Sequence, residues 1–153
     1  MGGRLVSKLL QGKGSVVVLT MPGQANLEER LHGYQAAFEP QSGIKISHVV
    51  DIQGKPQVAF DTSAAILDKE PKRVDAFVCL EAIAGKEVAE VVNRVKMSDK
   101  IIVAMDADPG TLEWVQKPFT WRSPACGCST ICIIIRSADW APIGPRTRPG
   151  LTG

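Results

Sequence analysis

Apolar residues follow two alternating periods along the first two thirds of this 153-residue chain. Short apolar runs, rich in β-branched residues, predict buried strands over 15–20, 44–50, 74–80 and 101–105. Between these runs, apolar residues recur three or four positions apart. This spacing predicts helices over 4–11, 26–38, 55–68, 82–95 and 111–116.

The helical stretches also predict which side chains face the core. We expect the inward residues of the third and fourth helices to be Val58, Ala65, Ile66 and Leu67, and Ile83, Val88, Val91, Val92 and Val95. Strands separated by helices of this length are typical of parallel sheets, because a parallel connection needs a crossover. The pattern therefore predicts an α/β fold: an open parallel sheet with helices on both faces.

The regular pattern stops after residue 117. Residues 118–153 are rich in Pro, Cys, Trp and Arg, and only 130–135 resembles a strand. We therefore predict an α/β lobe over 1–117 and an atypical, largely irregular tail over 118–153.

Charge excludes some classes of partner. Residues 1–117 carry 14 Lys and Arg against 15 Asp and Glu, whereas 118–153 carry four Arg and one Asp. The lobe therefore lacks the basic surface of a nucleic-acid-binding protein, and the tail is too sparsely charged to supply one. The longest apolar runs are far shorter than the roughly 20 residues of a membrane span, so we expect no membrane insertion.

No residue pattern indicates catalysis, a metal or a cofactor. Cys79 lies in an apolar run and is expected in the core, while Cys126, Cys128 and Cys132 form C-x-C-x3-C, which is not a usual zinc spacing. His32 and His48 are remote from these cysteines, and no nucleophile is accompanied by a base. We expect a protein that is not an enzyme and binds neither metal nor cofactor.

Two candidate ligand-binding residues follow the first strand, at the sheet edge where α/β proteins bind ligands. Asn26 is suited to capping the helix that it begins, or to binding a hydroxylated or anionic ligand at the helix N-terminus. Arg30, one turn further, can donate hydrogen bonds to a carboxylate or to sugar hydroxyls. Its alternative is a surface ion pair with Glu28 or Glu29.

Two acidic candidates follow the third and fourth strands. Glu81 either stabilises the first turn of a helix through the helix dipole or faces the same crevice as Asn26. Asp106 is the strongest candidate, because a carboxylate at the end of a buried strand is costly without partners. Its alternative role, capping the following helix, suits Asp108 or Thr111 better.

The order of these features resembles the carboxy-terminal lobe of the periplasmic sugar-binding proteins of the ribose/galactose type. The effector domains of LacI-type repressors share that fold. The resemblance covers residues 1–117 and is carried by R-x-x-G-[FY], by P-x-x-x-D-A, by a glycine in the next helix and by an aspartate after a strand: Arg30, Gly33 and Tyr34; Pro71, Asp75 and Ala76; Gly85; Asp106.

The resemblance implies a function in sugar transport. It implies that Arg30 and Asp106 hydrogen-bond a sugar, that Glu81 stands near the position of a family Asn-Asp pair, and that Gln116 corresponds to the glutamine of a Q-x-P motif. The implied partner is the membrane permease of an ABC transporter, and the implied location is the periplasm. The alternative is the effector-binding lobe of a LacI-type regulator or of a sensor, with a helix-turn-helix upstream in the regulator.

The sequence departs from this family in three respects. The amino-terminal lobe and a signal peptide are not recognisable, and the tail replaces the family's last helix and strand. We therefore expect a fragment that starts inside a longer gene, with an internal deletion near Gln116 and a frameshift after it. Expressed as written, it should stay in the cytoplasm.

Overall fold

The computed structural model describes residues 2–97 and 99–105 without interruption. It also describes Pro109, Thr111 and Glu113 singly, and the backbone of two short strands at 120–122 and 133–135. Most of the predicted helix over 111–116 and most of the predicted tail therefore lie outside the described residues.

Every helix and strand predicted within residues 1–105 is confirmed, with its bounds shifted by a few residues. The helices are α1 (Gly2–Leu9), α2 (Ala25–Phe38), α3 (Pro56–Lys69) and α4 (Ala82–Arg94). The strands are β1 (Lys13–Thr20), β2 (Gly43–Asp51), β3 (Ala76–Cys79), β4 (Ile101–Ala104), β5 (Thr120–Arg122) and β6 (Ile133–Ile135).

The strands form one sheet in the order β2-β1-β3-β4-β6-β5. The first four are parallel, as predicted. Strand β6 lies within the strand-like stretch 130–135 and pairs antiparallel with β4, while β5, which the sequence analysis did not predict, pairs antiparallel with β6.

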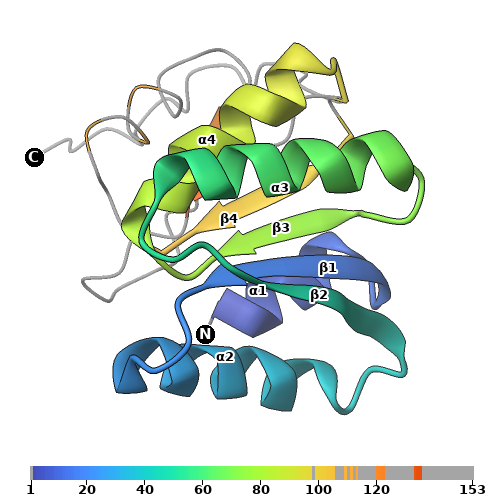
Figure 1. The fold of residues 1–153 in the computed structure, drawn as a ribbon. Coiled ribbons are helices and arrows are strands. Elements are labelled where there is room, and N and C mark those ends of the chain that lie inside the picture. Colours follow the sequence, from blue (N-terminus) through green and yellow to red (C-terminus); the bar gives the residue numbers. More distant parts are fainter. Residues whose placement is uncertain are drawn as a thin grey trace, which may run out of the picture.

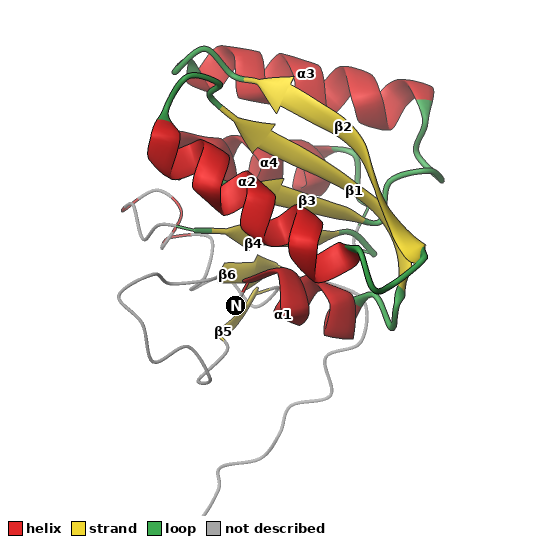
Figure 2. Ribbon diagram, turned by 90° about the horizontal axis from the view of Figure 1, so that it is seen from below, coloured by secondary structure: helices red, strands yellow, loops and turns green. Residues whose placement is uncertain are grey.

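Helices cover both faces of the parallel strands, with α3 and α4 on one face and α1 and α2 on the other (Figures 1 and 2). Successive side chains of β1 and β3 point to opposite faces and enter two separate cores. Both faces are covered, which is why the central run of β1, residues 16–19, and all of β3 are apolar. The α3/α4 core includes Val17, Leu19, Phe77 and Cys79, and the α1/α2 core includes Val16, Val18, Ala76 and Val78.

Strand β2 contains a bulge that changes the face covered by its side chains. Ser47 is the extra residue, because consecutive residues of β1 lie opposite Ile46 and His48. Before the bulge, Ile44 and Ile46 contribute to the α1/α2 core, and after it Val50 packs against the α3/α4 core. Without the extra residue all these even-numbered positions would share one face, so the bulge lets one edge strand serve both cores.

Two predicted core positions are wrong. Ala65 is exposed, because the buried face of α3 runs through Ala59, Ser63 and Leu67 at helical spacing and Ala65 lies off that line. Val95 is 41% exposed, because α4 ends at Arg94 and Val95 is its C-cap, beyond the last turn that packs on the sheet.

Candidate ligand-binding site

The parallel strands end almost level with one another, at the edge that carries the candidate residues. Thr20 of β1 lies opposite Asp51 of β2, and Cys79 of β3 lies opposite Ala104 of β4. The loops that follow these strands therefore meet at one carboxyl edge, where open α/β sheets bind ligands.

Arg30 is directed to this edge by a contact distant in sequence. Its Nη1 donates a hydrogen bond to the carbonyl oxygen of Leu80, the residue after β3, over 2.7 Å. The expected partner Glu28 is engaged elsewhere, since its Oε1 accepts a hydrogen bond from the Gly23 amide at 2.9 Å. The half-buried guanidinium thus joins α2 to the end of β3.

Glu81 follows Leu80 directly and is the N-cap of α4. Its Oε2 accepts a hydrogen bond from the Ile83 amide at 2.9 Å, and the residue is half-buried. The structure therefore shows the local, helix-stabilising role for this carboxylate. It also brings Arg30 and Glu81 to the same strand end, so both candidates lie at the carboxyl edge.

Tyr34 also contacts this edge, although the sequence analysis assigned it no role beyond its place in the R-x-x-G-[FY] motif. Its hydroxyl donates to Sδ of Met105, the residue after β4, over 3.2 Å. The ring is buried and meets Phe38 edge to face, with centroids 5.9 Å apart. The available signal was its position four residues after Arg30, which places both side chains on one face of α2.

Asn26 does not cap α2, so that prediction is wrong. The N-cap is Gln24, which has extended backbone angles and makes no side-chain capping hydrogen bond. The helix begins earlier than expected because Gln24 O accepts from both Leu27 and Glu28. Asn26 is exposed in the first turn, after the carboxyl end of β1, and remains a candidate for ligand binding.

Asp106 and Gln116 lie outside the described residues. Asp106 directly follows Met105, whose amide donates to the carbonyl oxygen of Cys79 at 3.1 Å. The continuously described part of the chain therefore ends with Met105 at the carboxyl edge, one residue before Asp106.

Asp75 of the P-x-x-x-D-A motif has a structural role at the opposite edge. Its Oδ2 accepts from the Ser15 amide at 2.7 Å, and its own amide donates to Ser15 O at 2.9 Å. Its carbonyl oxygen accepts from Ile101 at 3.0 Å. This one residue aligns the amino ends of β1, β3 and β4.

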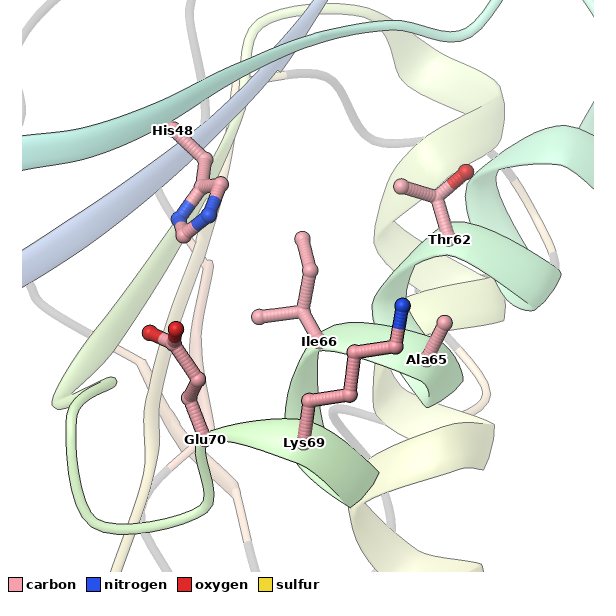
Figure 3. Close-up of a pocket in the computed structure, with 6 residues that line it drawn as sticks. All are labelled: His48, Thr62, Ala65, Ile66, Lys69 and Glu70. Carbon is pink, nitrogen blue, oxygen red and sulfur yellow. The ribbon is translucent and has the colours of Figure 1, made fainter.

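A hollow of about 260 Å³ lies between β2 and α3, away from the carboxyl edge (Figure 3). It is lined by His48, Thr62, Ala65, Ile66, Lys69 and Glu70. Lys69 is the last residue of α3 and Glu70 is its C-cap, where the chain turns back to the amino edge. The hollow therefore contains none of the candidate ligand-binding residues.

The described residues include no group of three or more His, Cys, Asp or Glu that could hold a metal ion. Among the same residues, no helix is long and apolar enough to cross a membrane. Burial, and secondarily the charge of Glu81, raises the pKa of the Cys79 thiol, so this thiol stays protonated in the core.

Residues 1–120 match a family described as the periplasmic binding protein domain. No curated protein matches the chain in sequence. Three similar solved structures are a sugar-binding protein of a sugar ABC transporter from Bacillus halodurans (28% identity, TM-score 0.71), a glucose-galactose binding protein from Geobacillus stearothermophilus (27%, 0.70) and an arabinose binding protein from the same organism (24%, 0.70).

The chain aligns with these structures over 74%, 76% and 76% of its own length, respectively. It covers only 40%, 42% and 40% of theirs, so it spans less than half of each protein that it resembles.

Proposed function

This chain belongs to the periplasmic binding protein domain family, and on that basis we propose that it is a sugar-binding lobe of an ABC transporter's solute-binding protein. The proposed location is the periplasm, and the proposed partners are a small sugar and the transporter's permease. The proposed activity is to bind the sugar without changing it chemically. The names of the similar solved proteins support a sugar as the ligand.

The observation that carries this proposal is the position of Arg30. A guanidinium offers several N–H donors in one plane, and sugar hydroxyls accept such hydrogen bonds. The bond to Leu80 O fixes the side chain at the carboxyl edge before a ligand arrives, which lowers the entropy lost on binding.

We assign Asp106 the complementary role of accepting hydrogen bonds from the sugar. Glu81, Asn26 and Gln116 are proposed as further ligand contacts, with Glu81 the weakest because its carboxylate already caps α4. The regulatory alternative is not favoured, since the solved proteins reported above are named as sugar-binding proteins and one belongs to an ABC transporter.

A lobe contacts only one side of a ligand, so we expect weak binding by the 153 residues alone. The test is a thermal-shift series with D-arabinose, D-glucose and D-galactose. A sugar at ten times its Kd stabilises the folded state by about 1.4 kcal/mol, which is a measurable shift.

Each variant is compared with and without sugar, so that its own stability cancels. Arg30→Ala and Asp106→Ala are expected to lose the sugar-dependent shift. The matched control is Arg73→Ala, because the Arg73 side chain is 79% exposed and lies by the amino edge. This variant should keep the sugar-dependent shift. A wild-type chain that responds to none of the sugars would contradict the proposal.

A further inference from the structure

Helix α2 holds the ends of two neighbouring strands through side chains one turn apart. Arg30 bonds to the carbonyl oxygen of Leu80 and Tyr34 bonds to the sulfur of Met105. Residues four apart lie on the same face of a helix, so a single face of α2 makes both contacts. Figure 2 shows α2 lying across the sheet on this side.

The two residues that α2 holds are the first beyond the paired parts of β3 and β4. Cys79 and Ala104 are the last register pair of these strands. Beyond them, Leu80 N donates to Leu19 O at 2.9 Å and Met105 N donates to Cys79 O at 3.1 Å. These single backbone bonds mark where each strand leaves the ladder, and the side chains of α2 act at those points.

We infer that Tyr34 is a positioning residue for the ligand site: its hydroxyl holds Met105 and so fixes the carboxyl end of β4. The inference rests on the proposed function, because that function places the sugar at the carboxyl edge where β3 and β4 end. Arg30 would then have two tasks, contacting ligand and fixing the end of β3. Tyr34 would fix the end of β4 without contacting the ligand.

The surroundings of Tyr34 favour such a role over simple space filling. A Cβ on Gly2 would collide with the Tyr34 hydroxyl oxygen and would lie 2.9 Å from Cζ. The start of α1 therefore closes against the phenol, and Phe38 meets the ring from within α2. With these neighbours the ring has little freedom, so the hydroxyl is directed at the Met105 sulfur, a polarizable but weak acceptor.

Because the hydrogen bond from Tyr34 to the Met105 sulfur is weak, its loss should affect ligand binding more than the stability of the fold. Tyr34→Phe keeps the ring and its packing and removes only the hydroxyl, so the melting temperature should stay within about 3 °C of wild type. If the hydroxyl positions the strand end, sugar binding should weaken several-fold in the same variant. Met105→Leu removes the acceptor and should weaken binding by a similar factor.

The matched controls delete the same groups elsewhere in the molecule. Ser63→Ala removes a buried hydroxyl from the α3/α4 side. Met97→Leu exchanges a methionine that packs against that same core. Both controls are expected to keep the wild-type Kd for the sugar. Gly2→Ala displaces the phenol without removing its hydroxyl, and is expected to weaken binding as Tyr34→Phe does.

A second readout does not need a ligand. In protein labelled with ¹³C at the methionine methyl groups, Tyr34→Phe should shift the Met105 signal and leave the Met97 signal unchanged. Met105→Leu identifies the signal by removing it.

The outcomes separate this inference from the proposed function. If wild type binds D-arabinose, D-glucose or D-galactose and Tyr34→Phe binds equally well, Tyr34 does not position the site and the inference is wrong. If no sugar binds, the proposed function fails. In that case an unmoved Met105 methyl signal in Tyr34→Phe overturns the contact itself, whereas a moved signal supports the hold on β4.

Discussion

Arg30 and Leu80 are 50 residues apart in sequence, yet Nη1 of the first lies 2.7 Å from the carbonyl oxygen of the second. Leu80 is fully buried and its amide is bonded to Leu19 O, so the carbonyl is presented by a rigid strand end. This hydrogen bond therefore holds the guanidinium of Arg30 at the carboxyl edge.

The Arg30–Leu80 contact should also stabilise the fold without ligand. Arg30→Met keeps most of the aliphatic stem but removes the donor. Hydrogen bonds from charged groups contribute about 1.5–3 kcal/mol, and this one is only partly buried. We therefore expect a loss of about 1–2 kcal/mol in the free energy of unfolding. Urea unfolding measures the loss. Arg73→Met, which removes an exposed arginine, should change stability by less than about 0.5 kcal/mol, and equal losses in both variants would refute the contact's importance.

Two helical glycines should respond to alanine in opposite directions. A Cβ on Gly85 of α4 would lie 2.9 Å from Ala104 Cβ and 3.2 Å from Thr111 Oγ1, so this glycine permits close packing of α4 on β4. Gly85→Ala should therefore destabilise by about 1–2 kcal/mol despite its better helix propensity.

Gly33 of α2 is the matched position, since a Cβ there would meet nothing within 4 Å. Gly33→Ala should stabilise by about 0.5–1 kcal/mol. Thermal unfolding of both variants distinguishes packing from propensity, and a shift of the same sign in both would be inconsistent with this account.

The end of α4 uses a lysine where glycine is favoured. Lys96 has φ of 55°, with Met97 N donating to Val92 O and Lys96 N to Asn93 O, the two bonds of a Schellman motif. Lys96→Gly should stabilise by about 0.5–1 kcal/mol by relieving the left-handed backbone.

Lys86→Gly is the control for the lysine-to-glycine change, since Lys86 is an exposed residue inside α4. It should destabilise by about 1 kcal/mol. Denaturant midpoints compare the two variants, and destabilisation by Lys96→Gly would show that the turn does not need the left-handed conformation.

A buried serine should be replaceable without loss. Ser63 is 1% exposed, and its hydroxyl has no hydrogen-bond partner among the described residues. Ser63→Ala should raise the free energy of unfolding by about 0.5–1 kcal/mol, through helix propensity and relief of an unsatisfied polar group. In contrast, Ser47→Ala removes a hydroxyl that donates to Val16 O at 3.3 Å and should lower it slightly. A clear loss in Ser63→Ala would indicate a partner for its hydroxyl.

Asp99 should contribute to stability in a pH-dependent way. The hydrogen bond from Lys100, 2.8 Å between Nζ and Oδ2, is the main cause that lowers the pKa of Asp99 below its ordinary 3.8. A lowered folded-state pKa adds stability above the unfolded-state pKa, and this contribution is lost as pH falls through the folded-state value.

Asp99→Asn should therefore lose a few tenths of a kcal/mol near neutral pH and converge with wild type as the pH falls below about 4. The effect is small because the Asp99 side chain is 66% exposed. Urea unfolding from pH 2.5 to 7 follows the difference. Asp68→Asn, at an exposed position of α3, provides the background for losing a carboxyl group. A difference that is constant across this range would rule out the linkage.

The predictions failed where a feature depends on contacts between residues that are far apart in sequence. Hydrophobic periodicity predicted the helices and parallel strands within residues 1–105, but not the bulge at Ser47, because the pattern of β2 does not show which core each side chain enters. It placed Leu67 inside correctly but also placed Ala65 there by local spacing, whereas contact with the sheet buried Ser63 instead.

For the candidate site too, local sequence identified some residues, and distant contacts decided the others. The residues Arg30 and Glu81 were identified from their places after predicted strands, and both lie at the carboxyl edge. Tyr34 was noted only as a component of a motif, because nothing near it in sequence points to Met105, 71 residues away. Asn26 was expected as the N-cap two residues too late, since the start of α2 is set by backbone bonds to Gln24 O.

By itself, the sequence determined the order of helices and strands, the parallel character of the first four strands and the edge at which polar residues gather. Those properties follow from local periodicity and chain direction. The tertiary structure alone decided that α2 holds the ends of β3 and β4 through Arg30 and Tyr34. That arrangement depends on how a helix packs across a sheet, and such packing joins residues that no local pattern relates.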